Sequence, residues 1–272
     1  MNGCVLRTAR PMAVVLGLGF SLSMAGSATA ADLAPHRALY TLNLERGDGG
    51  SGVTGASGTM AYEMGETCDA WTVEQRYRLK MGYSESPDVT IASSLESSEA
   101  KTGLRYRFDH KETRADEEEK TAGTAMLEGE DKGGTVEFEQ PSDKKIKLPP
   151  RMLFPTGHTA VLIDKAAAGE NFVSRQLFDG GTADAPVLVS AVIGAKVEPD
   201  PDLAKKSPLL DRPGWRVRLA FFPPDQKVEK PDYEIGMVLL DNGVSRDMVI
   251  DYGDYAIRAK LDDIEPMPKP GC

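Results

Sequence analysis

The chain has 272 residues, of which 42 are acidic and 32 are basic, so its formal net charge is −10 at pH 7. A negative net charge repels nucleic acid and anionic lipid head groups at long range. Composition therefore argues against a nucleic-acid-binding protein and against a protein held on a membrane by its charge, but it leaves open contact with the apolar tail of a lipid.

Residues 1–30 have the three parts of a secretory signal peptide. Arg7 and Arg10 supply the positive charge, residues 12–24 form an apolar run, and residues 28–30 form a small-residue cleavage site. The run is shorter than the roughly 18–20 apolar residues that a membrane span needs, so an uncleaved anchor is disfavoured. We expect cleavage between Ala30 and Ala31, export to the periplasm, and a mature chain that does not span a membrane. Loss of the two arginines gives that chain 30 basic and 42 acidic residues, a net charge of −12.

Alternation of apolar and polar residues predicts β-strands, because successive side chains of a strand point to opposite faces. The first strand is expected at His36–Glu45, and the clearest one lies at residues 70–81. In that segment one parity carries mostly apolar residues, namely Trp71, Val73, Tyr77, Leu79 and Met81. Residues 59–64 show the same pattern. The two segments predict an antiparallel hairpin with Cys68 at its tip.

A glycine-rich segment, residues 47–55, lies between the first two predicted strands. It contains Gly50, Gly52 and Gly55 in the spacing of a dinucleotide-binding fingerprint. That motif requires a helix whose N-terminus holds the pyrophosphate, whereas a strand is predicted here. The segment is therefore interpreted as a flexible hairpin loop.

Further strands are predicted through the middle of the chain, at residues 89–95, 104–109, 121–129, 135–140 and 144–148. The acidic run at residues 116–119 lacks the alternating carboxylates and the glycine of a calcium loop. It is interpreted as a solvated turn.

One helix is predicted after this series of strands. Thr156 can cap it, residues 160–168 are rich in helix formers, and Gly169 can end it. Its apolar stripe is expected to consist of Ala160, Val161, Ile163 and Ala167. Such a stripe is typical of a helix that packs on a sheet, and here it is expected to fill or cover the concave side of one.

The second half of the chain returns to strands, at residues 171–178, 187–197, 215–222, 233–240, 245–252 and 255–264. Asn242-Gly243 favours a hairpin turn because both residues tolerate positive φ. Residues 199–213 are interpreted as a surface loop and residues 266–270 as an extended tail. About twelve to fourteen strands and one helix predict a single, mostly antiparallel all-β domain over residues 31–272.

Two cysteines, Cys68 and Cys272, remain once the signal peptide with Cys4 is removed. An even pair in an exported protein indicates a disulfide. Two free thiols are the alternative. A metal site is disfavoured because neither cysteine has another cysteine or a histidine nearby in the sequence.

The search for catalytic motifs finds no nucleophile elbow and no zinc-protease helix motif. The three histidines, His36, His110 and His158, are far apart in the sequence, and an isolated histidine is more often structural. His158, near the helix start, is the best candidate for a functional role. We predict no catalytic, cofactor-binding or metal-binding residues, no cofactor, and no enzymatic activity.

Several stretches together resemble one known family. They are residues 34–40, 62–64, 68–71, 153–158 and 178–180, with the closing Cys272. By their order and spacing the chain resembles the cell-envelope integrity protein B (EipB) family of alphaproteobacterial periplasmic proteins. The resemblance implies a large curled sheet that forms an unclosed barrel, or β-spiral, and a disulfide between Cys68 and Cys272. It also implies a non-enzymatic role in envelope integrity, a likeness to periplasmic lipoprotein carriers, and a link to a tetratricopeptide-repeat envelope protein.

The resulting hypothesis is a periplasmic protein that supports the envelope by binding or scaffolding a lipid, a peptide or a protein partner. A lipid or peptide would lie in the concave face, because a curved sheet with an apolar concave side can hold one. The alternatives are a lipid or lipoprotein carrier and, less favoured, an envelope hydrolase with a dispersed site.

Overall fold

The computed structural model describes residues 31–224 and 230–272. In these ranges the strands form one 14-stranded antiparallel sheet. The first eight are β1 (His36–Gly47), β2 (Val53–Glu66), β3 (Ala70–Tyr83), β4 (Val89–Ala100), β5 (Arg105–Arg114), β6 (Glu117–Leu127), β7 (Gly134–Gln140) and β8 (Lys145–Leu148). The other six are β9 (Phe172–Leu177), β10 (Val187–Val197), β11 (Gly214–Phe222), β12 (Tyr233–Leu240), β13 (Ser245–Asp251) and β14 (Tyr255–Pro266).

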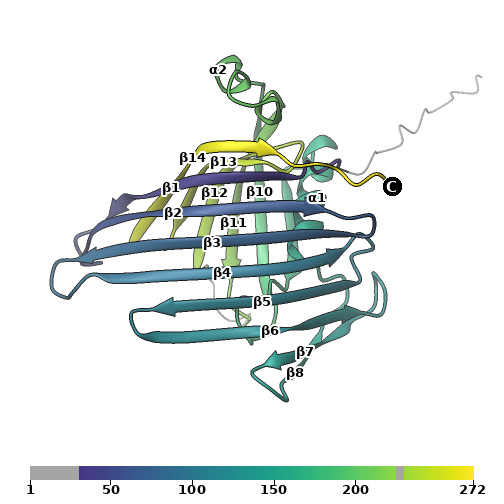
Figure 1. The fold of residues 1–272 in the computed structure, drawn as a ribbon, viewed down its shortest axis with the longest axis horizontal. Helices are drawn as coiled ribbons and strands as arrows, with labels where there is room; N and C mark the ends of the chain where they lie inside the picture. Colours follow the sequence, from purple (N-terminus) through teal and green to yellow (C-terminus); the bar gives the residue numbers. More distant parts are fainter. Residues whose placement is uncertain (1–30, 225–229) are drawn as a thin grey trace, which may run out of the picture.

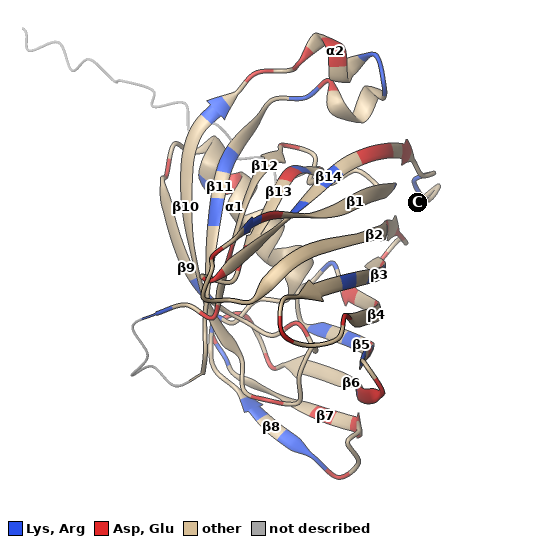
Figure 2. Cartoon of the chain, turned by 90° about the vertical axis from the view of Figure 1, so that its left-hand side faces the viewer, with Lys and Arg blue, Asp and Glu red and all other residues tan. Residues whose placement is uncertain are grey.

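The strand order is β8-β7-β6-β5-β4-β3-β2-β1-β14-β13-β12-β11-β10-β9. Two meanders, β1–β8 and β9–β14, are thus joined where β1 pairs with β14, from His36 opposite Pro266 to Gly47 opposite Tyr255. The edges of the sheet are β8 and β9, which follow each other in the sequence and do not pair. The sheet curls so that the two meanders form facing walls (Figures 1 and 2). The prediction of a large, curled, unclosed antiparallel sheet is confirmed.

Burial along the strands explains why they form. In β1, residues His36, Ala38, Tyr40 and Leu42 are buried, while Arg37 and Leu39 between them are exposed. Similar alternation in β10 buries Val189, Ala191 and Ile193. These two strands therefore give one face to the interior and one to solvent.

The edge strands β8 and β9 face each other along a line that we call the seam. A segment without regular secondary structure covers the seam in place of strand pairing. The segment 149–154 crosses it, and the N–H of Leu153 donates to the carbonyl oxygen of Gln176 at 2.9 Å. Beyond β9, the carbonyl oxygen of Asp179 accepts from the Tyr106 hydroxyl at 2.8 Å, and that of Gly180 accepts from Thr121. An aromatic core backs this seam, formed by Tyr106, Phe108, Phe138, Phe154 and Phe178.

Helix α1 (Pro155–Ala167) fills part of the concave side, as predicted (Figure 2). It buries Leu162, Ile163 and Ala166 in a core with side chains from both walls, including Val73 of β3 and Val189 of β10. The predicted stripe was partly wrong, because Ala167 is exposed and Leu162 and Ala166 are buried instead. Gly169 follows the helix with a positive φ of 79°, as its role at the helix end requires.

The predicted cap of α1 was also wrong. The N-cap position is held by Phe154, and Thr156 lies inside the helix. The carboxylate of Glu99, from β4, accepts hydrogen bonds from the backbone N–H groups of Thr156 at 2.8 Å and Gly157 at 2.7 Å. A side chain 57 residues away in the sequence therefore satisfies the free donors of this helix.

Three loop predictions differ from the structure. Strand β2 begins at Val53, inside the predicted glycine-rich loop. Residues 117–119 belong to β6 rather than to a turn, since they pair with β5 and Glu118 bonds Lys111 at 2.7 Å. The predicted surface loop 199–213 contains α2 (Pro201–Ala204) and a 3-10 helix, η1 (Pro208–Leu210), because Asp200 and Ser207 cap these turns.

Candidate functional site

A cavity of about 220 Å³ lies in the concave interior, between the first strands, β13 and the start of α1. Its wall is largely apolar or aromatic and includes Met60, Tyr62, Val73, Leu95 and Met248. Drug-sized pockets have volumes of roughly 300–1,000 Å³, so this cavity matches a segment of a chain-like ligand rather than a large compact one.

The polar groups of the wall are uncharged at neutral pH. The Tyr40 hydroxyl donates to the carbonyl oxygen of Ser245 at 2.8 Å, and Nδ1 of His36 lies 2.7 Å from the carbonyl oxygen of Ala34. Burial lowers the pKa of His36, which keeps its ring neutral. Burial, helped by the negative charge of Glu99, raises the pKa of Tyr62 to about 12. A neutral wall with few hydrogen-bonding groups favours an apolar ligand.

Glu99 lies on β4, beside the N-terminus of α1, and 3% of its surface is exposed. Burial raises its pKa, while its hydrogen bonds to Thr156 and Gly157 act in the opposite direction. Its place in the sequence gave a usable signal, because Glu99 has the same strand parity as Leu95 and Ser97, which line the cavity. An acidic side chain on the inward-facing side of a strand needs a buried hydrogen-bond partner. Here the partner is the N-terminus of α1.

A second set of hydrogen-bonded polar side chains lies on β3, β4 and β5. Oγ of Ser93 is 3.0 Å from Nε2 of His110, and the Tyr77 hydroxyl donates to Glu112 at 2.8 Å. A serine beside an imidazole resembles a nucleophile with its base. The third member of a catalytic triad is a carboxylate on the imidazole, and within residues 31–224 and 230–272 no carboxylate bonds the His110 ring.

His158, the histidine favoured from the sequence, is 4% exposed, and its Nε2 has no hydrogen-bond partner among the described residues. Burial and, to a lesser extent, the charge of Arg175 lower the pKa of His158 to about 4. The side chain is therefore neutral at physiological pH. In the part of the chain that the structure describes, no nucleophile or acid bonds this ring, although such bonds are the arrangement that would favour a hydrolase.

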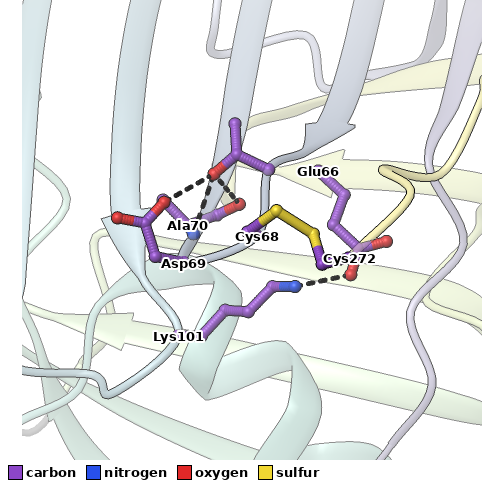
Figure 3. Close-up of a disulfide and its surroundings, with 7 residues drawn as sticks. Glu66, Cys68, Asp69, Ala70, Lys101 and Cys272 are labelled. Atoms are coloured by element: carbon purple, nitrogen blue, oxygen red, sulfur yellow. Dashed lines mark hydrogen bonds and ion pairs between the residues drawn. A yellow bond between two sulfur atoms is a disulfide. The ribbon is translucent and has the colours of Figure 1, made fainter.

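Cys68 and Cys272 are joined in the structure (Figure 3), with Cα atoms 5.8 Å apart. Cys68 lies in the turn between β2 and β3, where the Thr67 side chain bonds Asp69 and Ala70. Beside it, Lys101 bonds Glu66 at 2.7 Å and lies over the Trp71 ring. The C-terminal tail is also held by a hydrogen bond from the Met267 N–H to the Pro35 carbonyl oxygen and by the ion pair of Lys269 with Asp32.

The predicted cleavage site falls at the border of the described structure. Ala30 lies outside the described residues, so cleavage between Ala30 and Ala31 stays a prediction. Ala31 packs against the core around α1. None of the helices in residues 31–224 and 230–272 has the length and apolar character needed to cross a membrane.

Comparison with known proteins gives consistent matches. The EipB-like family model matches residues 27–268. The cell envelope integrity protein EipB of Brucella abortus is 34% identical over 254 residues, which cover 91% of this chain and 89% of that protein. A crystal structure of a beta-barrel-like protein from Brucella abortus, of the domain of unknown function DUF1849, superposes with a TM-score of 0.80 and 32% identity. It covers 88% of this chain and 100% of that one.

Proposed function

The chain belongs to the EipB-like family, and from this membership we propose that it is a non-enzymatic periplasmic protein that supports cell-envelope integrity by holding an apolar ligand. The proposal includes removal of the signal peptide before Ala31. It also includes a single domain over residues 31–272 with a disulfide between Cys68 and Cys272, a bond that an oxidising compartment favours.

The interior cavity is the observation that carries the proposal. It has a neutral wall of methionine, aromatic and aliphatic side chains, and a few hydroxyl groups that can orient a polar end. Transfer of apolar surface from water into such a wall is favourable by roughly 25 cal/mol per Å². The ligand class that fits is an acyl chain or an apolar peptide side chain.

Binding of an uncharged fluorescent probe, N-phenyl-1-naphthylamine, tests this proposal. We expect the mature protein to bind the probe and a lipid extract of the envelope to displace it. Met60→Trp and Met248→Trp fill the cavity and should each weaken binding. Met126→Trp is the matched control, because Met126 lies on β6 with 48% of its surface exposed. The proposal fails if the native protein does not bind the probe, or if both interior variants bind it as the control does.

A carrier would also transfer its ligand between membranes. A transfer assay on the same protein tests this alternative. Vesicles loaded with a fluorescent lipid are mixed with empty vesicles, and the transfer rate is measured with and without the protein. Acceleration that is lost in Met60→Trp would indicate a carrier, whereas binding without acceleration would indicate a protein that retains its ligand.

A further inference from the structure

A second and larger cavity, of about 590 Å³, lies at the seam of the sheet. It is bounded by α1, β9, the crossing segment 149–154, and the turns that follow β4 and β6. Its apolar residues include Leu104, Leu127, Met152, Leu153 and Val161. It shares no lining residue with the interior cavity, and its volume lies in the range of sites that take drug-sized ligands. We refer to it as the seam groove.

Three basic residues, Arg151, Lys165 and Arg175, and two acidic residues, Glu130 and Asp131, line the seam groove. Arg151 is paired with Asp131 at 2.7 Å, and Lys165 is paired with Glu170 at 2.7 Å. Arg175 differs, because its guanidinium donates to the Ser174 carbonyl oxygen at 2.8 Å and has no carboxylate within 4.0 Å among the described residues. The groove therefore holds a guanidinium that is not neutralised by its neighbours.

The buried histidine supplies an independent observation. His158 precedes Val161 by three residues, which places both on the same side of α1, and Val161 and Arg175 line the groove. Nε2 of His158 has no partner among the described residues, although buried polar atoms in folded proteins normally have one. The positive charge of Arg175 helps to lower the pKa of this ring, so the buried imidazole and the exposed guanidinium lie in the same region of the structure.

We propose that the seam groove binds an anionic amphiphile, with the acyl chain on the apolar floor and a carboxylate or phosphate head group on Arg175. A head group of this kind supplies an anionic acceptor in addition to the Ser174 carbonyl oxygen, and charge-assisted hydrogen bonds to arginine are the strongest class for such anions. The proposal extends the ligand-binding role to a separate site and does not depend on the interior cavity.

The test compares a fluorescent fatty acid, cis-parinaric acid, with its uncharged methyl ester on the mature protein. We expect the acid to bind more tightly than the ester. Arg175→Gln should weaken binding of the acid about tenfold or more, the loss expected for one hydrogen bond between charged groups, and should leave the ester unchanged. Arg78→Gln is the matched control, because Arg78 is an exposed arginine on β3. Val161→Trp should block both probes at the groove.

Displacement identifies the source of the head group. Decanoate and decyl phosphate have the same chain length, so the better competitor against cis-parinaric acid shows whether the site prefers carboxylate or phosphate. The proposal is overturned if neither competes, if Arg175→Gln behaves as Arg78→Gln does, or if Val161→Trp binds both probes normally. Met60→Trp separates the two sites, since it should weaken binding at the interior site and leave the preference for acid over ester intact. Melting curves for each variant verify that it is folded.

Discussion

Breaking the link between Cys68 and Cys272 should destabilise the protein by an amount that can be worked out from the structure. The two residues are 204 positions apart, so the bond closes a loop that spans most of residues 31–272. The chain-entropy model gives about 5 kcal/mol for a loop of this length, acting on the unfolded state.

The native state of the variant recovers part of this free energy. Lys269 and Met267 still hold the beginning of the tail through Asp32 and Pro35, but the last residues, 270–272, have no strand partner. Freeing such residues returns about 1 kcal/mol or more of backbone entropy for each one. We therefore expect a net loss of about 2–4 kcal/mol, which corresponds to a fall in melting temperature of about 4–16 °C.

Thermal unfolding of Cys68→Ser, Cys272→Ser and the double variant measures this loss. All three should melt at similar temperatures, because one bond is missing in each. A reductant should lower the melting temperature of the native protein to that of the variants and should not change the variants. The reasoning is refuted if the oxidised native protein titrates with two free thiols, or if the single variants differ from each other by more than the loss itself.

Three further predictions concern buried ionisable groups. Glu99→Ala should lower the free energy of unfolding in urea by about 2–4 kcal/mol, because two helix N–H groups lose their acceptor, whereas Glu96→Ala, an exposed control on the same strand, should change it by less than about 0.5 kcal/mol. The pKa of His158 is lowered to about 4, so between pH 6.5 and 4 the unfolded chain binds a proton that the native state excludes. The free energy of unfolding should therefore fall by up to about 3 kcal/mol as pH drops from 6.5 to about 4. His158→Phe should flatten this slope. The pKa of Tyr62 is raised from 10.0 to about 12, so the native state keeps a proton that the unfolded state loses; stability should fall as pH rises above 10, less steeply in Tyr62→Phe, and the absorbance of tyrosinate follows the titration. A flat pH dependence in the native protein would contradict either titration.

The strands were predictable wherever one face is buried and the other is wet, because burial imposes the period-two pattern. Strands β1 and β10 were located in this way. Strand ends were less predictable where both faces are exposed or polar, as at residues 117–119, since pairing with β5 through Lys111 leaves no apolar signal.

Contacts between distant parts of the chain were not predictable from local rules. Thr156 satisfies the local pattern of a helix cap, but the acceptor comes from Glu99, on a strand 57 residues earlier. The cavity wall likewise combines β1–β5 with β13 and α1, so its shape depends on how the whole sheet curls. The inward parity of Glu99 was present in the sequence, but its partner was not.

The strand order has a consequence for biogenesis. Within each meander every strand pairs with its neighbour in the sequence, so each can zip together from successive hairpins as the chain appears. The pairing of β1 with β14 is different, because His36 pairs with Pro266, which is synthesised much later. Since synthesis runs from the N-terminus, the edge of β1 remains open after β2–β8 have assembled on its other side, and an unpaired edge of this kind recruits foreign strands. The edge of β1 is therefore exposed until β14 has been made, and a chaperone that shields unpaired strand edges would act on β1.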